Sequence, residues 1–148
     1  TTVMNVFTNF DPQAATVVGF GVRCLLISTE AQNGPIARKL AGLGCRVETC
    51  DEVYSGLDRV IDDPVEYELV VIDCDSSGGF ALGQRAHTLL KVTQRCIPMM
   101  LISKECVAQN FPMNRHEPTL LRAPLSSVSL RVGFQHVLQE RMLMARGI

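Results

Sequence analysis

Two polar side chains stand where runs of apolar residues end. Asp73 follows the aliphatic run 69–72, and Ser103 follows the apolar run 97–102. A carboxylate in such a place can act as a nucleophile or as a ligand for a hard cation, and a hydroxyl can bind an oxyanion. Each side chain also has a structural interpretation, because Asp and Ser commonly cap the turn that follows. Position favours the chemical interpretation for Asp73 and the capping interpretation for Ser103.

Two further carboxylates lie close to these positions. Glu30 follows the apolar run 24–28, and Asp75 lies two residues after Asp73. With Asp73 they form a candidate set of ligands for a divalent cation. The alternative is that Glu30 and Asp75 are solvated loop acids, which are more common than metal ligands.

The elements that must position these side chains alternate between strands and helices. Apolar or alternating runs predict strands at 24–28, 45–50, 69–72, 97–102 and 119–122. Helical spacing predicts helices at 35–41, 55–61, 80–92 and 127–145, with a short helix at 106–111. This order indicates an α/β fold, a doubly wound five-stranded parallel sheet with helices on both faces in three layers. Its functional site is expected at the carboxyl ends of the strands.

Composition narrows the function classes. The chain has 148 residues, 47% of them hydrophobic, with 14 Lys and Arg against 15 Asp and Glu. It lacks the basic excess of a nucleic-acid-binding protein, and no apolar run reaches membrane-spanning length. We therefore expect no nucleic-acid partner and no membrane partner. Residues 1–22 are polar and small, and we interpret them as an N-terminal arm or linker before a domain at 23–148.

The six cysteines indicate a reduced compartment. They form no C-x-x-C pair, and the three histidines have no ligand spacing to them. Four of them, Cys24, Cys50, Cys74 and Cys96, lie in or beside apolar runs, where cysteine acts as a small hydrophobic residue. A cytoplasmic protein is favoured over a disulfide framework or a zinc site.

The strand sequences, taken in order, resemble a known family. Residues 67–73 look like the third-strand motif of response-regulator receiver domains, and 97–103 resemble their fourth strand, which ends in Ser or Thr. Residues 44–50 are similar to the second strand with its preceding glycine, and 120–124 to the fifth strand with its terminal Lys-Pro. The match spans residues 23–143 and implies the receiver, or flavodoxin-like, fold.

The resemblance also implies roles for the site residues. In the family, an Asp matching Asp73 accepts a phosphoryl group from a histidine kinase, and an acidic pair holds Mg²⁺ beside it. A Lys ending the fifth strand contacts the phosphoryl oxygens, and a hydroxyl matching Ser103 closes on the group. Phosphoryl transfer is chiefly positioning and charge neutralisation, so these charges matter.

The chain departs from the family pattern where charge is needed. The acidic pair aligns with Ser28 and Thr29 and the lysine with Ala123. Leu120 stands where the family has an aromatic residue on its fifth strand, which follows the switching hydroxyl inward. Arg122 is adjacent to Ala123, but neighbouring strand residues point to opposite faces. We therefore identify the chain as a degenerate member, a pseudo-receiver, and expect no cofactor. Glu30 and Asp75 are the candidates for a shifted Mg²⁺ site beside Asp73.

Three functions follow. The favoured one is a signalling module of a bacterial two-component system or phosphorelay that acts through protein–protein interaction and is not an enzyme. Its expected partner is a histidine kinase or another signalling protein, and its last strand and last helix are the expected surface for partners or a homodimer. The first alternative is an active phosphoacceptor, phosphorylated on Asp73. The second is a sensor of a small anion or nucleotide that uses Arg115, His116 and Arg122.

Overall fold

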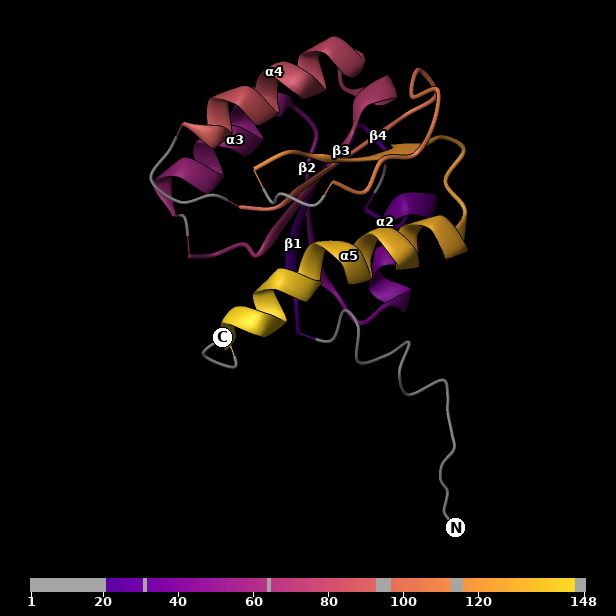
Figure 1. Cartoon of the computed structure of the whole chain (residues 1–148). Coiled ribbons are helices and arrows are strands. Elements are labelled where there is room, and N and C mark those ends of the chain that lie inside the picture. Colours follow the sequence, from indigo (N-terminus) through magenta and orange to yellow (C-terminus); the bar gives the residue numbers. More distant parts are fainter. Residues whose placement is uncertain (1–20, 31, 64, 93–96, 113–115, 146–148) are drawn as a thin grey trace.

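A parallel sheet forms the centre of the computed structural model (Figure 1). The structure describes residues 21–145 except 31, 64, 93–96 and 113–115, with side chains described through residue 138. The strand order is β2-β1-β3-β4-β5. The strands are β1 (Arg23–Ile27), β2 (Arg46–Cys50), β3 (Leu69–Asp73), β4 (Met99–Ser103) and β5 (Thr119–Arg122). The predicted five-stranded parallel sheet is confirmed.

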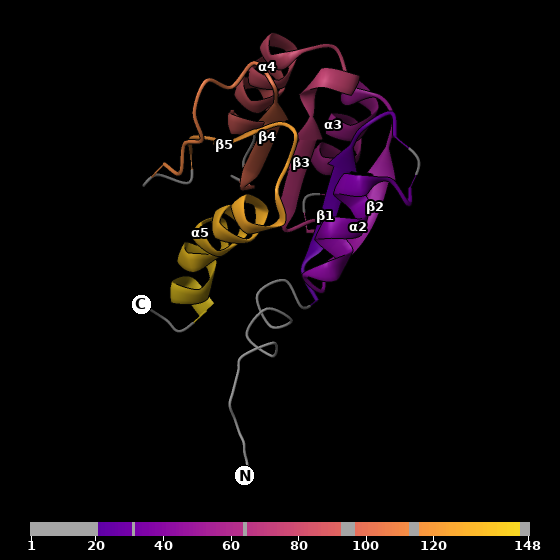
Figure 2. The ribbon, with the colours of Figure 1, turned by 90° about the vertical axis from the view of Figure 1, so that its right-hand side faces the viewer.

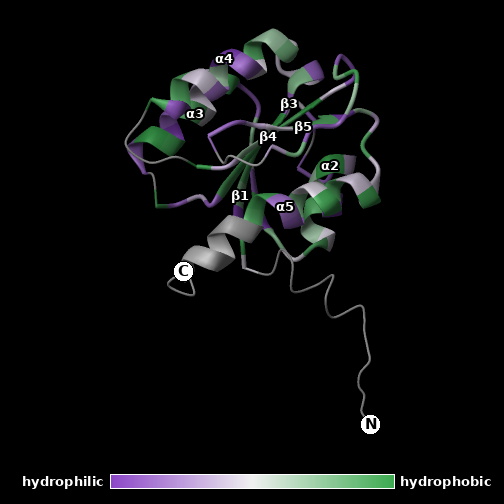
Figure 3. Ribbon diagram, in the orientation of Figure 1, coloured by the Kyte–Doolittle hydropathy of each residue, from purple (hydrophilic) through white to green (hydrophobic). Residues whose placement is uncertain are grey.

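Helices cover both faces of the sheet. Figures 1 and 2 show α2 (Pro35–Gly42) and α5 (Ser127–Ala145) on one side, with α3 (Val53–Asp62) and α4 (Phe80–Lys91) on the other. Each side has its own hydrophobic core, and the helices carry both hydrophobic and hydrophilic residues (Figure 3). The predicted three-layer sandwich is therefore present.

Strand burial follows position in the sheet. Every residue of β3 and β4 is buried, as expected for apolar strands between two helical layers. In β2, an edge strand, exposed and partly buried residues alternate up to the buried Cys50. The register pairs Ile27 with Ile72 and Asp73 with Ile102, so the residues that follow β1 lie beside the end of β3.

Local sequence sets where two of the helices begin. The Glu52 carboxylate accepts hydrogen bonds from the Tyr54 and Ser55 amides at 2.8 and 2.9 Å, so α3 begins at Val53, two residues before its predicted start. Before α4, Gly79 has a φ of 104°, a conformation that favours glycine. On α4, a Cβ added to Gly83 would lie 2.5 Å from the Cys74 sulfur, so this helix packs directly against the residue after Asp73.

The predicted helix at residues 106–111 is wrong. The structure has bends and irregular backbone there, and Asn110 forms an antiparallel bridge with Leu120 of β5. The Arg122 guanidinium donates to the Val107 carbonyl, and Pro112 disfavours helical geometry at the residue before it. A six-residue segment has little helical stability of its own, so these competing bonds decide its conformation.

Cysteine burial and the start of the domain complete the fold. The five described cysteines, Cys24, Cys45, Cys50, Cys74 and Cys106, are buried and free. This agrees with the apolar interpretation of Cys24, Cys50 and Cys74, while Cys96 lies outside the described residues. Val22, the last residue of the predicted arm, is buried in the core, and residues 1–20 lie outside the description. Among the described helices, none has both the length and the apolar character to cross a bilayer.

Candidate functional site

The sequence-predicted site residues gather at the carboxyl edge of the sheet. Asp73 ends β3 and is only 8% exposed, while Ser28, directly after β1, is 2% exposed. The Ser28 hydroxyl donates a hydrogen bond of 2.9 Å to Oδ2 of Asp73. A neutral hydroxyl therefore meets the buried carboxylate.

Ser28 and Ser76 extend this contact into a small network. The two hydroxyl oxygens lie 3.3 Å apart, and Ser28 Oγ also accepts from the Glu30 amide at 3.1 Å. Ser76 Oγ accepts from the Thr29 amide at 3.1 Å. Ser76 belongs to η1 (Cys74–Ser76), the short 3₁₀ turn after β3. Sequence reasoning missed Ser76, although the pair of serines after Asp75 was a signal for hydroxyls at this edge.

Ser103 and Asp75 form a second network beside the first. The Ser103 hydroxyl donates to Oδ1 of Asp75 at 2.7 Å, and the Lys104 amide donates to Oδ2 at 2.8 Å. The Glu105 amide in turn donates to Ser103 Oγ at 3.0 Å. Ser103 is fully buried, so its hydroxyl is committed to this bridge between η1 and the end of β4. Ser103 therefore contacts Asp75, whereas the family resemblance placed its hydroxyl beside Asp73.

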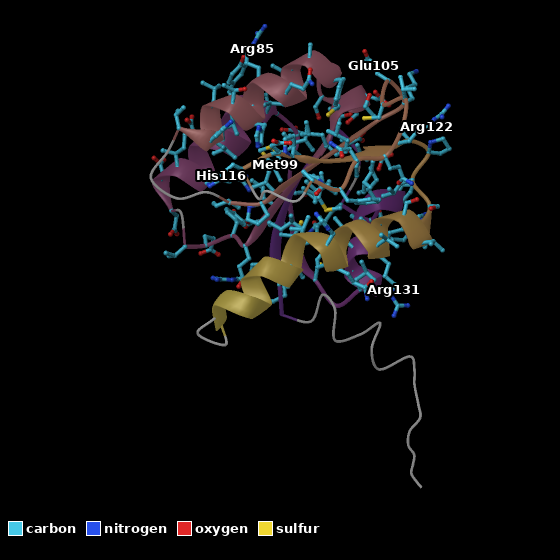
Figure 4. The ribbon with its side chains drawn as sticks, in the orientation of Figure 1. Arg85, Met99, Glu105, His116, Arg122 and Arg131 are labelled. Carbon is cyan, nitrogen blue, oxygen red and sulfur yellow. The ribbon has the colours of Figure 1, made fainter. Side chains whose placement is uncertain are left out.

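Glu105 ties the β4–β5 connection to α4. Its carboxylate accepts a hydrogen bond of 3.2 Å from the Phe80 amide at the first residue of the helix. Figure 4 shows Glu105 on the connection beside the start of α4. The loops after β3 and β4 are therefore joined by two carboxylates, Asp75 from one side and Glu105 from the other.

The candidate metal ligands do not assemble into a cation site within the described residues. No group of three or more His, Cys, Asp or Glu side chains there has a metal-binding arrangement, and Asp73, Asp75 and Glu30 form none. Glu30 is exposed, and both oxygens of Asp75 already accept hydrogen bonds. A hard cation requires several converging oxygens, which this arrangement does not provide.

The end of β5 carries no cation toward Asp73. Ala123 is partly buried against the core, and its amide donates to the Ser103 carbonyl at 3.1 Å. The neighbouring Arg122 is exposed, and Figure 4 shows it projecting outward. Its guanidinium donates to the Val107 carbonyl at 3.3 Å. Arg122 therefore cannot replace the lysine that the family places after this strand.

The residues suggested for anion binding are not brought together. His116 precedes β5 and Arg122 ends it, so the two lie at opposite ends of the strand, as Figure 4 shows. Arg115 lies outside the described residues. An anion site that uses His116 and Arg122 jointly is absent from the described part of the chain.

Cys74, the buried cysteine next to Asp73 in the sequence, has a thiol of low reactivity. Burial, with smaller effects from Cys106 and Asp75, raises the pKa of the Cys74 thiol to about 12. A thiol with that pKa is protonated at neutral pH and is a poor nucleophile. Cys74 therefore contributes packing against Gly83 and no reactive group.

The strand order β2-β1-β3-β4-β5 and the polar residues at the carboxyl edge define a doubly wound α/β domain. Solved structures with the same fold allow a closer comparison. A receiver domain from Clostridium thermocellum aligns with a TM-score of 0.61 and 18% identity over 82% of this chain and 98% of that one. The chemotaxis response regulator CheY4 of Vibrio cholerae gives 0.60 and 14%, over 80% and 99%. A streptococcal redox sensor, of a family evolved from two-component response regulators, gives 0.60 and 17%, over 86% and 56%.

These likenesses show the fold. The chain has the fold of response-regulator receiver domains, as the strand motifs predict. No family model matches the sequence, and no curated protein matches it.

Proposed function

We propose that this chain is a degenerate receiver domain, a cytoplasmic module of bacterial two-component signalling that works through protein contacts and turns over no substrate. The hydrogen bond from Ser28 to Asp73 carries the proposal. In the family that the chain resembles, acidic side chains at the Ser28 and Thr29 positions hold Mg²⁺ beside the acceptor Asp. Here a neutral hydroxyl satisfies the carboxylate directly.

Electrostatics support the loss of phosphoryl transfer. Without the acidic pair, a hard cation loses two anionic ligands and its affinity falls steeply. Without a lysine at Ala123, the charge that develops on a transferring phosphoryl group meets no fixed cation. The two remaining elements, Asp73 and Ser103, do not neutralise that charge.

The position of Ser103 supports a domain held in one state. In active receivers the matching hydroxyl closes on the phosphoryl group. Here it is bound to Asp75 at 2.7 Å and also accepts from the Glu105 amide. Moving the buried Ser103 hydroxyl toward Asp73 would break both bonds, which opposes switching.

Surface composition supports a role in protein contacts. On α5, Val128 and Val132 are 73% and 45% exposed, and Val107 on the β4–β5 connection is 90% exposed. Exposed aliphatic side chains near the last strand and last helix suit an interface that excludes water. The proposed partners are a histidine kinase, another signalling protein or a second copy of the chain.

A phosphodonor experiment tests the proposal. The parent chain, Asp73→Asn, and a restored variant with Ser28→Asp, Thr29→Asp and Ala123→Lys are each incubated with acetyl phosphate, with and without Mg²⁺. Intact-mass spectrometry then measures phosphorylation. We expect labelling of the restored variant only, because it regains the acidic pair and the lysine. Mg²⁺-dependent labelling of the parent that Asp73→Asn abolishes would instead establish the active phosphoacceptor.

A further inference from the structure

Acidic residues are unevenly distributed along the chain: they concentrate around α3 and are missing from the segments that form α2 and most of α5. Residues 31–47 and 118–139 contain Arg38, Lys39, Arg46, Arg122 and Arg131, and no Asp or Glu. These segments include α2, β5 and most of α5. Residues 48–68, which include α3, hold eight of the 15 acids and one base, Arg59. The overall net charge of −1 therefore hides a cationic layer formed by α2 and α5.

A hollow opens in this cationic layer between α2 and the first turn of α5. It has a volume of roughly 370 Å³ and is lined by Pro35, Arg38, Lys39, Gly42, Leu43 and Ser127. The first four lie at i, i+3, i+4 and i+7, so they form one stripe along α2. We call this hollow the α2/α5 groove.

The floor of the groove is apolar and open. Leu43 is 9% exposed and belongs to the core, and Pro35 begins α2. A Cβ added to Gly42 would meet nothing within 4 Å, so the absent side chain leaves space above the helix. The groove can therefore receive an apolar side chain between its two flanking cations.

The cations of the groove are uncompensated within the described residues. The two salt bridges there join Arg23 to Glu68 and Arg59 to Glu48, and neither involves α2 or α5. Arg131 lies one helical turn after Ser127 on the same face of α5, and Figure 4 shows it reaching outward from this layer. The carboxylate nearest in sequence to α2, Glu30, is exposed and precedes the helix.

We infer that the α2/α5 groove docks an acidic, partly apolar segment of a partner protein, with Arg38 and Lys39 flanking an inserted aliphatic side chain. This inference rests on the proposed function, since it names a contact surface for a domain that works through contacts. Charge complementarity favours this partner, because its carboxylates would pair with the uncompensated cations of the groove. The acidic residues around α3 would repel the rest of an acidic partner and so orient it. The lining has no aromatic side chain on which nucleic-acid bases could stack.

Fluorescence anisotropy tests the inference with a labelled 12-residue peptide of alternating Glu and Leu. Arg38→Glu with Lys39→Glu reverses both flanking charges and should weaken binding by about tenfold or more. Gly42→Leu should weaken it by filling the hollow with no change of charge. The matched control, Arg85→Glu with Lys91→Glu on α4, makes the same charge change on the opposite face and should leave binding unchanged.

Several outcomes would overturn the inference. These are no binding by the parent, equal weakening by the α4 control, no effect of Gly42→Leu, or equal competition by single-stranded RNA. Circular dichroism of each variant establishes that it is folded before binding is compared. The phosphodonor experiment separates the two proposals. If the parent neither binds the peptide nor is labelled, only the docking role of the groove is contradicted. If Asp73 is labelled in a Mg²⁺-dependent manner and the peptide still binds, only the degenerate-receiver proposal is contradicted.

Discussion

Two carboxylates at the same edge of the sheet, Asp73 and Asp75, are held in opposite ways. Asp73 is buried and its Oδ2 is bound by the Ser28 hydroxyl. Asp75 is exposed and links η1 to the end of β4 through Ser103 and the Lys104 amide. Although only two residues apart, Asp73 is a buried carboxylate and Asp75 is an exposed carboxylate that connects two loops.

The difference shows that two carboxylates at one sheet edge can be satisfied in separate hydrogen-bond networks, one buried and one exposed. A hydroxyl satisfies a carboxylate without adding charge, so the Asp73 pocket needs no cation to be stable. Asp75 accepts the hydrogen bond of the Ser103 hydroxyl. In the proposed degenerate receiver, the Ser28 bond takes the place of a cation beside Asp73, and the Asp75 bond holds Ser103 away from it.

The largest expected effect comes from adding a second charge beside Asp73. Ser28→Asp replaces the hydrogen bond with like-charge repulsion at a buried position and should destabilise the domain by roughly 3 kcal/mol at neutral pH. Millimolar Mg²⁺ should recover part of that loss, because the pair then resembles a cation site. Urea unfolding with and without Mg²⁺ measures both quantities. Thr29→Asp at the exposed neighbouring position is the control, and an unchanged stability in Ser28→Asp would show that the hydroxyl is dispensable.

Breaking the Asp75 bridge should cost less, because that carboxylate is exposed. Asp75→Ala should lower the free energy of unfolding by about 1 kcal/mol, the scale of a solvent-accessible hydrogen-bonded carboxylate. A double-mutant cycle with Ser103→Ala isolates the coupling between the two side chains. A coupling free energy of zero would contradict the bridge.

Glu52 provides the smallest effect and a reference for a carboxylate that is neither buried nor bridging. Hydrogen bonds from the Tyr54 and Ser55 amides lower its pKa below the ordinary 4.5. Its contribution to stability is therefore present above pH 4.5 and is lost as pH falls through the lower folded-state pKa. Wild type should exceed Glu52→Gln in unfolding free energy near neutral pH, with the difference shrinking below pH 4.5. A difference independent of pH would show that the ionised cap is not responsible.

The sequence predicted the strands and the sheet correctly but not the conformation of the connection between β4 and β5. The aliphatic runs of β3 and β4 are buried on every residue, so burial on both faces was visible in composition alone. Residues 106–111 have helix-forming members, but their conformation depends on Asn110 pairing with Leu120 and on Arg122 reaching Val107. Such long-range bonds leave no periodic trace in a segment of six residues.

The sequence predicted that the candidate residues lie at one edge of the sheet, and it predicted only some of their neighbours. Strand order brings Ser28 beside Asp73, and the resemblance indicated both positions. The resemblance did not indicate that Ser103 would bind Asp75, because that contact depends on the path of η1. The absence of a side chain at Gly83 lets η1 pack closely against α4. A turn whose shape depends on packing cannot be derived from the residues of the turn alone.

The strand order also bears on how the sheet assembles at the ribosome. Within residues 23–122, β2 and β3 each pair with β1, then β4 pairs with β3 and β5 with β4. Each strand after β1 that emerges during synthesis thus finds a neighbouring strand already made. The sheet can grow outward as the chain lengthens, so the apolar edges of β1 and β3 are exposed only until the next strand arrives.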